Sequence, residues 1–118
     1  MTQLTTHVLD ISAGSPAAGL LIELHALQSE APPQLLASAT TGPEGRLPGP
    51  LLAGPAFRAG RYSLTFHVAR YFRQRGVVLP DPAFIEEAVL RIGIADPARH
   101  YHVPLLIAPW SYCVYRGS

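Results

Sequence analysis

Residues 60–76, GRYSLTFHVARYFRQRG, contain both of the local patterns that decide the fold class. From Tyr62 to Val68, apolar and polar side chains alternate, which is typical of a half-buried antiparallel strand. The residues that follow, VARYFRQRG, place Tyr71 and Phe72 among arginine and glutamine and end at Gly76. This second pattern predicts a short helix closed by a glycine cap.

The rest of the chain is divided into short segments by twelve prolines and ten glycines. The segments between them are rich in β-branched and aromatic residues: LTTHVLDIS, GLLIELHAL, QLLASATT, AFIEEAVLRIGI, HYHVPLLIAP and SYCVYRG. Seven or eight short strands at this spacing predict an all-β sandwich or barrel. No internal repeat or linker interrupts the pattern, so we expect a single domain over residues 1–118.

The composition restricts the kinds of partner that this protein can have. Apolar residues make up 48% of the chain and charged residues only 14%, below the usual ~25%. Either the surface is unusually neutral, or other subunits cover part of it, and we favour the second. The net charge is +1 and the basic residues form no block, which argues against a nucleic-acid partner.

Cysteine content and the apolar runs bear on the cellular location. The single cysteine, Cys113, cannot form an intramolecular disulfide, which argues against a disulfide-stapled secreted domain. The first ten residues have neither the basic nor the apolar region of a signal peptide. No apolar run approaches the ~20 residues needed to cross a bilayer. We therefore expect a cytoplasmic protein that does not insert into membranes.

The segment HYHVPLLI, residues 100–107, alternates between two kinds of side chain. Its odd-numbered residues are apolar or aromatic and are expected to face the core, which places His100 and His102 together on the opposite face. Pro104 within the run predicts an edge strand or a local irregularity. The chain closes on YRGS without a polar tail, and we expect this end to be docked rather than loose.

Several polar residues are candidates for chemistry, although each is a weak signal alone. His7 shares a strand face with Thr5, Leu9 and Ile11, so it is either a partly buried structural residue or a functional one. His100 and His102 have a spacing that can hold a metal, but no carboxylate or cysteine recurs at ligand spacing, and we predict no metal site. Arg46 in TTGPEGR is either a solvated side chain or a clamp for an anion or carbonyl.

Taken together and in order, these motifs resemble the transthyretin-related proteins over essentially the whole chain. The segments that carry the resemblance are TTHVLD, GSPAAGLLIEL, TGPEGR, AGRYSLTFHVARYF and RHYHVPLLIAPWSYCVYRGS. HYHVPLL followed by YRGS is specific to the enzyme branch of that family, the 5-hydroxyisourate hydrolases. The hormone-carrier branch has other residues where this chain has His7, Arg46 and His102, and it lacks the YRGS ending.

The resemblance implies an all-β fold, a transthyretin-like sandwich of two antiparallel four-stranded sheets with one short helix after the fifth strand. It also implies a homotetramer, built as a dimer of dimers, with active sites in the channel between dimers and no metal or organic cofactor. The implied reaction is hydrolysis of 5-hydroxyisourate to 2-oxo-4-hydroxy-4-carboxy-5-ureidoimidazoline, a step of urate degradation towards allantoin.

Motif matching transfers the family's site residues to numbered positions of this chain. It implies catalytic roles for His7, Arg46, His102 and Ser118, and substrate-binding roles for His7, Arg46, Tyr115, Arg116 and Gly117. Either histidine can be the general base, because an imidazole titrates near neutral pH. A serine at the end of the chain is a poor place to hold the geometry of a nucleophile. The sequence departs from the family pattern at Glu44, His67, Arg99 and Cys113.

Two functions other than catalysis remain open at this point. The leading alternative is a non-catalytic tetrameric carrier of a flat small molecule. Imidazole and guanidinium groups in the binding channel argue against a carrier, because buried polar groups are costly without a polar partner. A sandwich that serves only as an interaction module would explain the low charge but not the paired histidines.

Overall fold

The computed structural model describes residues 2–118 and contains mostly strands. In chain order the elements are β1 (Gln3–Asp10), β2 (Ser15–Pro16), β3 (Leu21–Gln28), β4 (Ala31–Thr40), β5 (Leu52–Ala53), the 3-10 helix η1 (Gly54–Ala56), β6 (Gly60–Phe66), α1 (Val68–Gln74), β7 (Ala88–Ile94), β8 (Tyr101–Ala108) and β9 (Ser111–Val114). The predicted all-β fold with one short α-helix is confirmed. Met1 lies outside the described residues, and the single domain over 1–118 stays a prediction.

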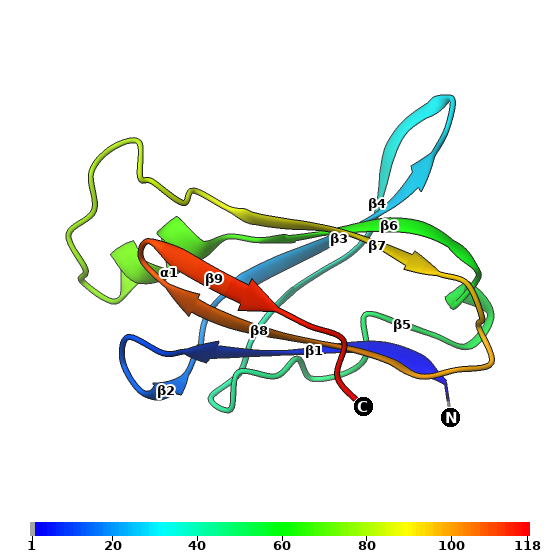
Figure 1. The fold of residues 1–118 in the computed structure, drawn as a ribbon, viewed down its shortest axis with the longest axis horizontal. Coiled ribbons are helices and arrows are strands. Elements are labelled where there is room, and N and C mark those ends of the chain that lie inside the picture. The colour runs from blue at the N-terminus through cyan, green and yellow to red at the C-terminus, as the bar shows by residue number, and fades with distance from the viewer. Residues whose placement is uncertain (1) are drawn as a thin grey trace.

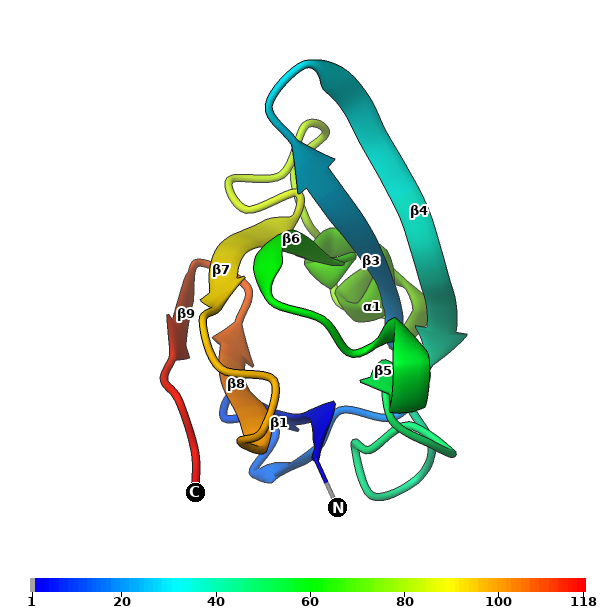
Figure 2. The same cartoon turned by 90° about the vertical axis from the view of Figure 1, so that its right-hand side faces the viewer.

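The strands form two sheets that pack face to face (Figures 1 and 2). The first sheet has the order β2-β1-β8-β9, with β5 also paired to β1, and the second has the order β4-β3-β6-β7. The first sheet differs from the expected four antiparallel strands, because β5 makes it five-stranded and β1 runs parallel to β8. The parallel pair is possible because the whole second sheet lies between β1 and β8 in the chain, and parallel strands need a long connection.

The core lies between the sheets and follows the predicted alternation. In β6, Tyr62, Leu64 and Phe66 are buried, and in β8 the buried positions run from Tyr101 to Ile107 at every second residue. Burial of each large apolar side chain contributes about 1.5–3 kcal/mol. His102 and Pro104 therefore lie on the outer face of β8, as the sequence predicts. Both are half-buried there.

Pro104 lies in an interior strand, so the expectation of an edge position was wrong. Strand β8 is flanked by β1 and β9. The alternative expectation, a local irregularity, is confirmed on the β9 side. Regular pairing ends where Val114 faces Leu105, and beyond it the Pro104 carbonyl accepts a long 3.4 Å bond from the Tyr115 amide. Proline has no backbone N–H to donate, so the hydrogen bonds between β8 and β9 cannot continue in a regular pattern.

The helix α1 follows β6 directly and covers one end of the sandwich (Figure 1). Its buried residues are Val68, Ala69, Tyr71 and Phe72. Gly76 follows it with a φ of 84°, a left-handed conformation that favours glycine, so the predicted glycine cap is confirmed. Among the described residues, no helix has the length and apolar character needed to cross a membrane.

Candidate active site

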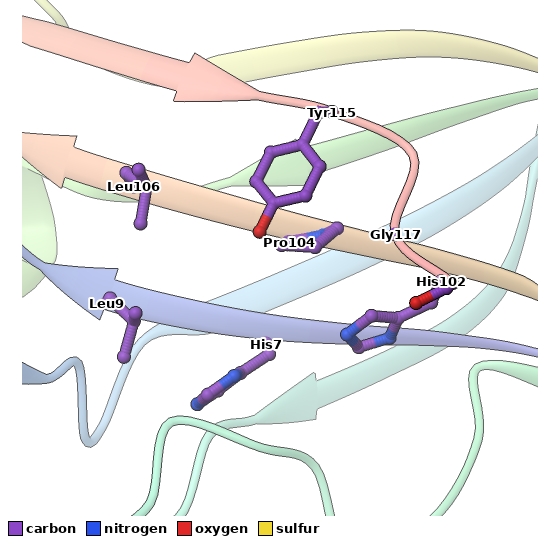
Figure 3. Close-up of a pocket in the computed structure, with 8 residues that line it drawn as sticks. His7, Leu9, His102, Pro104, Leu106, Tyr115 and Gly117 are labelled. Atoms are coloured by element: carbon purple, nitrogen blue, oxygen red, sulfur yellow. The ribbon is translucent and has the colours of Figure 1, made fainter.

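A hollow of about 210 Å³ lies on the outer face of the first sheet, over β1 and β8 (Figure 3). Side chains that point away from the core form its floor, and the last residues of the chain form one wall. The lining residues are His7, Leu9, His102, Pro104, Leu106, Tyr115, Gly117 and Ser118. Five of the seven residues that the resemblance implied for the site therefore meet in one hollow.

The parallel pairing of β1 with β8 brings the two ends of the chain together. In this register His7 lies beside Pro104, and Thr5 lies beside His102. Because successive side chains of a strand alternate between faces, Thr5 and His7 point outward together with His102. His7 is half-buried as expected, while the neighbouring Thr6 and Val8 face the core.

The loop that contains Glu44, Gly45 and Arg46 is tied to β1 by backbone bonds. The Val8 amide donates to the Gly45 carbonyl at 2.9 Å, and His7 and Arg46 form an isolated antiparallel bridge. Gly45 has a φ of 75°, and a Cβ there would lie 2.2 Å from the Val8 carbonyl oxygen. Only glycine fits such a close approach in the left-handed region. The loop is thereby held against the strand that carries His7.

The His7 ring is oriented by this loop. Its Nε2 lies 2.9 Å from the Glu44 carbonyl oxygen. A carbonyl can only accept, so Nε2–H is the donor. In neutral His7 the proton is on Nε2, and Nδ1 retains a lone pair.

The His102 ring is held by Thr5 and lies near Arg46, His100 and His7. Its Nδ1 lies 2.8 Å from the Thr5 hydroxyl oxygen. Burial lowers the pKa of His102 below its usual 6.5, and the charges of Arg46, His100 and His7 lower it further. His102 is consequently neutral near pH 7 and is able to accept a proton.

The end of the chain is docked on β8, as expected. The Gly117 amide donates to the His102 carbonyl at 2.8 Å. A Cβ on Gly117 would lie 2.8 Å from Cδ2 of His102, so the backbone passes as close to that ring as glycine allows. The Tyr115 ring leans over Pro104 in Figure 3, although 57% of the residue remains exposed.

The two arginines expected at the site do not line the hollow, whose lining is drawn from residues 2–118. Arg46 is exposed beside His7, and its charge is near enough to lower the pKa of His102. The Arg116 guanidinium lies 4.1 Å from the centre of the Tyr101 ring and donates to the His100 carbonyl at 3.3 Å. In this single chain Arg116 therefore supports the strand next to His102 rather than the hollow itself.

Other reactive side chains lie apart from the hollow. Cys113 is exposed on β9 and is not among the lining residues. Within residues 2–118, no three His, Cys, Asp or Glu side chains are grouped so that they could hold a metal ion. Thr5 was not predicted as a site residue, although its position two residues before His7 on the same strand face was a usable signal.

The chain is similar to known proteins over nearly its whole length. The family model described as HIUase/Transthyretin family matches residues 4–117. The chain belongs to the HIUase/Transthyretin family. Within it, 5-hydroxyisourate hydrolase 2 of Rhizobium meliloti (strain 1021) is 53% identical over 116 residues, which cover 98% of this chain and 96% of the relative.

Two solved structures are also similar to this chain. A structure of (S)-allantoin synthase is 42% identical with a TM-score of 0.91; the match covers 99% of this chain but 44% of that longer chain. Sea bream transthyretin in complex with thyroxine is 24% identical with a TM-score of 0.86, and the match covers 97% of this chain and 93% of that chain. This second likeness concerns the fold alone and confirms the predicted transthyretin-like sandwich.

Proposed function

We propose that this protein hydrolyses 5-hydroxyisourate to 2-oxo-4-hydroxy-4-carboxy-5-ureidoimidazoline, towards allantoin. The observation that carries the proposal is that His7 and His102 line one hollow, while the charge of Arg46 acts on His102. Membership of the HIUase/Transthyretin family and the name of the Rhizobium meliloti relative support it.

Hydrolysis of a lactam makes three chemical demands on the site. A water must become nucleophilic, the tetrahedral oxyanion must be stabilised, and the leaving nitrogen must receive a proton. The water oxygen bonds to the carbonyl carbon and the carbon–nitrogen bond of the lactam breaks; one water proton ends on the leaving nitrogen, and the other is released when the new carboxylic acid ionises. A neutral imidazole can accept the first proton, and an imidazolium can donate it to the nitrogen.

The chain offers side chains for each demand. In our proposal His7 and His102 bracket the attacking water, one as base and the other as acid or orienting group. Arg46 stays charged and holds a carbonyl of the substrate or the developing oxyanion. Tyr115, Gly117 and Ser118 close the hollow around the substrate, and Arg116 holds the adjoining strand. The proposal requires no metal or organic cofactor.

The assembly is part of the proposal. We infer a homotetramer, a dimer of dimers, in which a second chain covers the outer face of the first sheet. Tyr115 is 57% exposed and Ile11 is 55% exposed near this face, which leaves apolar surface for a partner. The cytoplasmic location expected from the sequence stays a prediction.

The first prediction concerns the two histidines. Replacing His7 or His102 by asparagine should lower the enzyme-dependent rate by about 10²–10⁴-fold, the usual contribution of general acid–base catalysis. The measurement is the loss of near-ultraviolet absorbance of freshly generated 5-hydroxyisourate, corrected for its spontaneous decay. Arg46→Ala should also be slower, since it removes the charge beside the hollow.

A matched control separates catalysis from folding. His25 is half-buried on β3 in the second sheet, away from the hollow, and His25→Asn should keep wild-type rates. Wild-type rates in both His7→Asn and His102→Asn would refute the assignment. Binding of the substrate by wild-type protein without faster decay would instead favour the carrier.

A further inference from the structure

The Thr5 hydroxyl lies between two imidazoles on the outer face of the first sheet. Its Oγ1 is 2.8 Å from Nδ1 of His102 and 3.4 Å from Nε2 of His100. The two rings are nearly parallel, with centroids 6.4 Å apart and an angle of 13° between their planes. One hydroxyl therefore contacts both histidines, although the proposed mechanism assigns no role to Thr5 or His100.

The number of protons limits how these three groups can be connected. A threonine hydroxyl carries one proton, so it can donate to only one of the two rings. If it donates to Nε2 of His100, it must accept the proton carried by Nδ1 of His102. Nε2 of His102 then keeps its lone pair. The opposite arrangement would place the proton of neutral His102 on Nε2, because the hydrogen bond of one ring nitrogen decides the state of the other.

The charges around His102 favour the first arrangement. Arg46 is the permanent charge that acts on it, His100 and His7 act on it when protonated, and Tyr115 and the last residue, Ser118, line the same hollow. The backbone of Arg46 pairs with that of His7, so Arg46 lies on the His7 side of His102, and the far ring nitrogen of His102, Nε2, points into the space beside His7 in Figure 3. A lone pair directed towards positive charge is attracted to it, whereas an N–H dipole in the same direction is repelled.

We propose that Thr5 and His100 are positioning residues that hold His102 in the tautomer with its proton on Nδ1. The chain of bonds runs from His102 Nδ1–H to Thr5 Oγ1, and from the Thr5 hydroxyl to Nε2 of His100. It presents Nε2 of His102 to the hollow as a proton acceptor in a fixed orientation. This inference rests on the proposed function only for its effect on catalysis, since the tautomer itself is a property of the protein without substrate.

The tautomer can be measured without any substrate. Side-chain ¹⁵N chemical shifts of His102, recorded on uniformly labelled protein above the pKa of the ring, distinguish a protonated from an unprotonated nitrogen. We expect Nδ1 protonated and Nε2 unprotonated in the wild type and in Thr5→Ser, which keeps the hydroxyl. In Thr5→Val, which has nearly the same shape but no hydroxyl, the Nε2-protonated form should appear.

Kinetics provide the second measurement. Thr5→Val should lower kcat by about 10–100-fold, comparable with the loss of an outer hydrogen-bond partner of a metal-bound imidazole. Its KM should stay within about twofold, because Thr5 does not line the hollow. Thr5→Ser should restore most of kcat. His100→Gln, whose side-chain oxygen can accept the Thr5 proton, should retain more activity than His100→Leu.

The neighbouring threonine is a matched control for stability. The buried Thr6 hydroxyl donates to the Val103 carbonyl at 2.7 Å rather than to an imidazole, so Thr6→Val removes a bond between the same two strands. We expect a lower unfolding temperature in Thr6→Val with an unchanged His102 tautomer.

Two results would overturn the inference: a proton on Nε2 of His102 in the wild type, or wild-type tautomer and kcat in Thr5→Val. If the wild type did not hydrolyse the substrate, the proposed function would fail, and the ¹⁵N shifts would still decide the tautomer.

Discussion

Gly117 links the end of the chain to the candidate active site. Its amide donates to the carbonyl of His102, and its α-carbon faces the His102 and Pro104 side chains. A Cβ there would lie 2.8 Å from Cδ2 of His102 and 3.1 Å from Cγ of Pro104. Side chains in proteins do not make contacts this short. The His102 ring can therefore take its present position only because residue 117 has no side chain.

The tight contact at Gly117 can be tested by substitution. Gly117→Ala should lower kcat/KM by about tenfold or more, since overpacking of this kind costs about 1–3 kcal/mol and each 1.4 kcal/mol is a factor of ten. The cost falls on the orientation of His102 or on the docking of Tyr115 and Ser118. Steady-state hydrolysis of 5-hydroxyisourate measures it.

Gly49→Ala is the control, because a Cβ at Gly49 meets nothing within 4 Å. Equal rates in the two variants would mean that the tail near Gly117 does not position the site.

At the scale of elements, a buried hydrogen bond joins β1 to α1. The Tyr71 hydroxyl donates to Oδ2 of Asp10 at 2.9 Å, and Asp10 is only 2% exposed. Oδ1 of Asp10 accepts from the Ser12 amide, the Ser12 hydroxyl and the Ala13 amide. The carboxylate thus closes the turn after β1 and anchors the helix, and β1 carries Thr5 and His7.

The pKa of Tyr71 makes this link testable. Burial first, and then the hydrogen bond to Asp10 and the charge of its carboxylate, together raise the pKa of Tyr71 from 10.0 to about 12. Because the unfolded chain loses the phenol proton at lower pH than the folded chain, stability is full below pH 10. It should fall as the pH rises from about 10 to about 12.

Tyr71→Phe should reduce this alkaline loss of stability. At pH 7 we expect the substitution to cost about 0.5–1.5 kcal/mol, since Asp10 keeps its other three donors. Urea unfolding at pH 7, 10 and 11.5 measures both effects. The same alkaline loss in wild type and variant would show that another group causes it.

In the molecule as a whole, three of the exposed large apolar side chains lie at or beside two sheet edges. Strands β7 and β9 end the second and the first sheet, and they lie side by side in both views (Figures 1 and 2). Val89 on β7 is 49% exposed, Tyr112 on β9 is 41% exposed and Trp110 before β9 is 70% exposed. Unpaired edges with apolar side chains are suited to pairing with another chain, which agrees with the low charge content of the sequence.

The proposed tetramer can be tested by measuring its mass. Light scattering on the purified protein should give about four times the 12.7 kDa of one chain. Val89→Glu should lower the mass, because it places a charge on the β7 edge. Val78→Glu is the control, since Val78 is 94% exposed in the loop after α1. A monomeric wild type at micromolar concentration would contradict the assembly.

Local sequence was enough to predict which side chains of β6 and β8 face the core and which face outward, because alternation is a local property of an extended chain. It likewise determined the helix at Val68–Gln74, whose glycine cap is encoded next to it. The identity of His7, His102 and the YRGS tail as candidates came from motif resemblance to the family rather than from local physics.

Which of these residues meet depends on long-range packing. The parallel pairing of β1 with β8 joins segments nearly a hundred residues apart, and its register results from packing two whole sheets rather than from any local pattern. That register places Thr5 against His102, which no spacing along the chain predicts. Regular pairing of β8 with β9 stops at Pro104, and Gly117 then passes close to the His102 ring at the border of the hollow. The guanidinium of Arg116 turns to the Tyr101 ring instead.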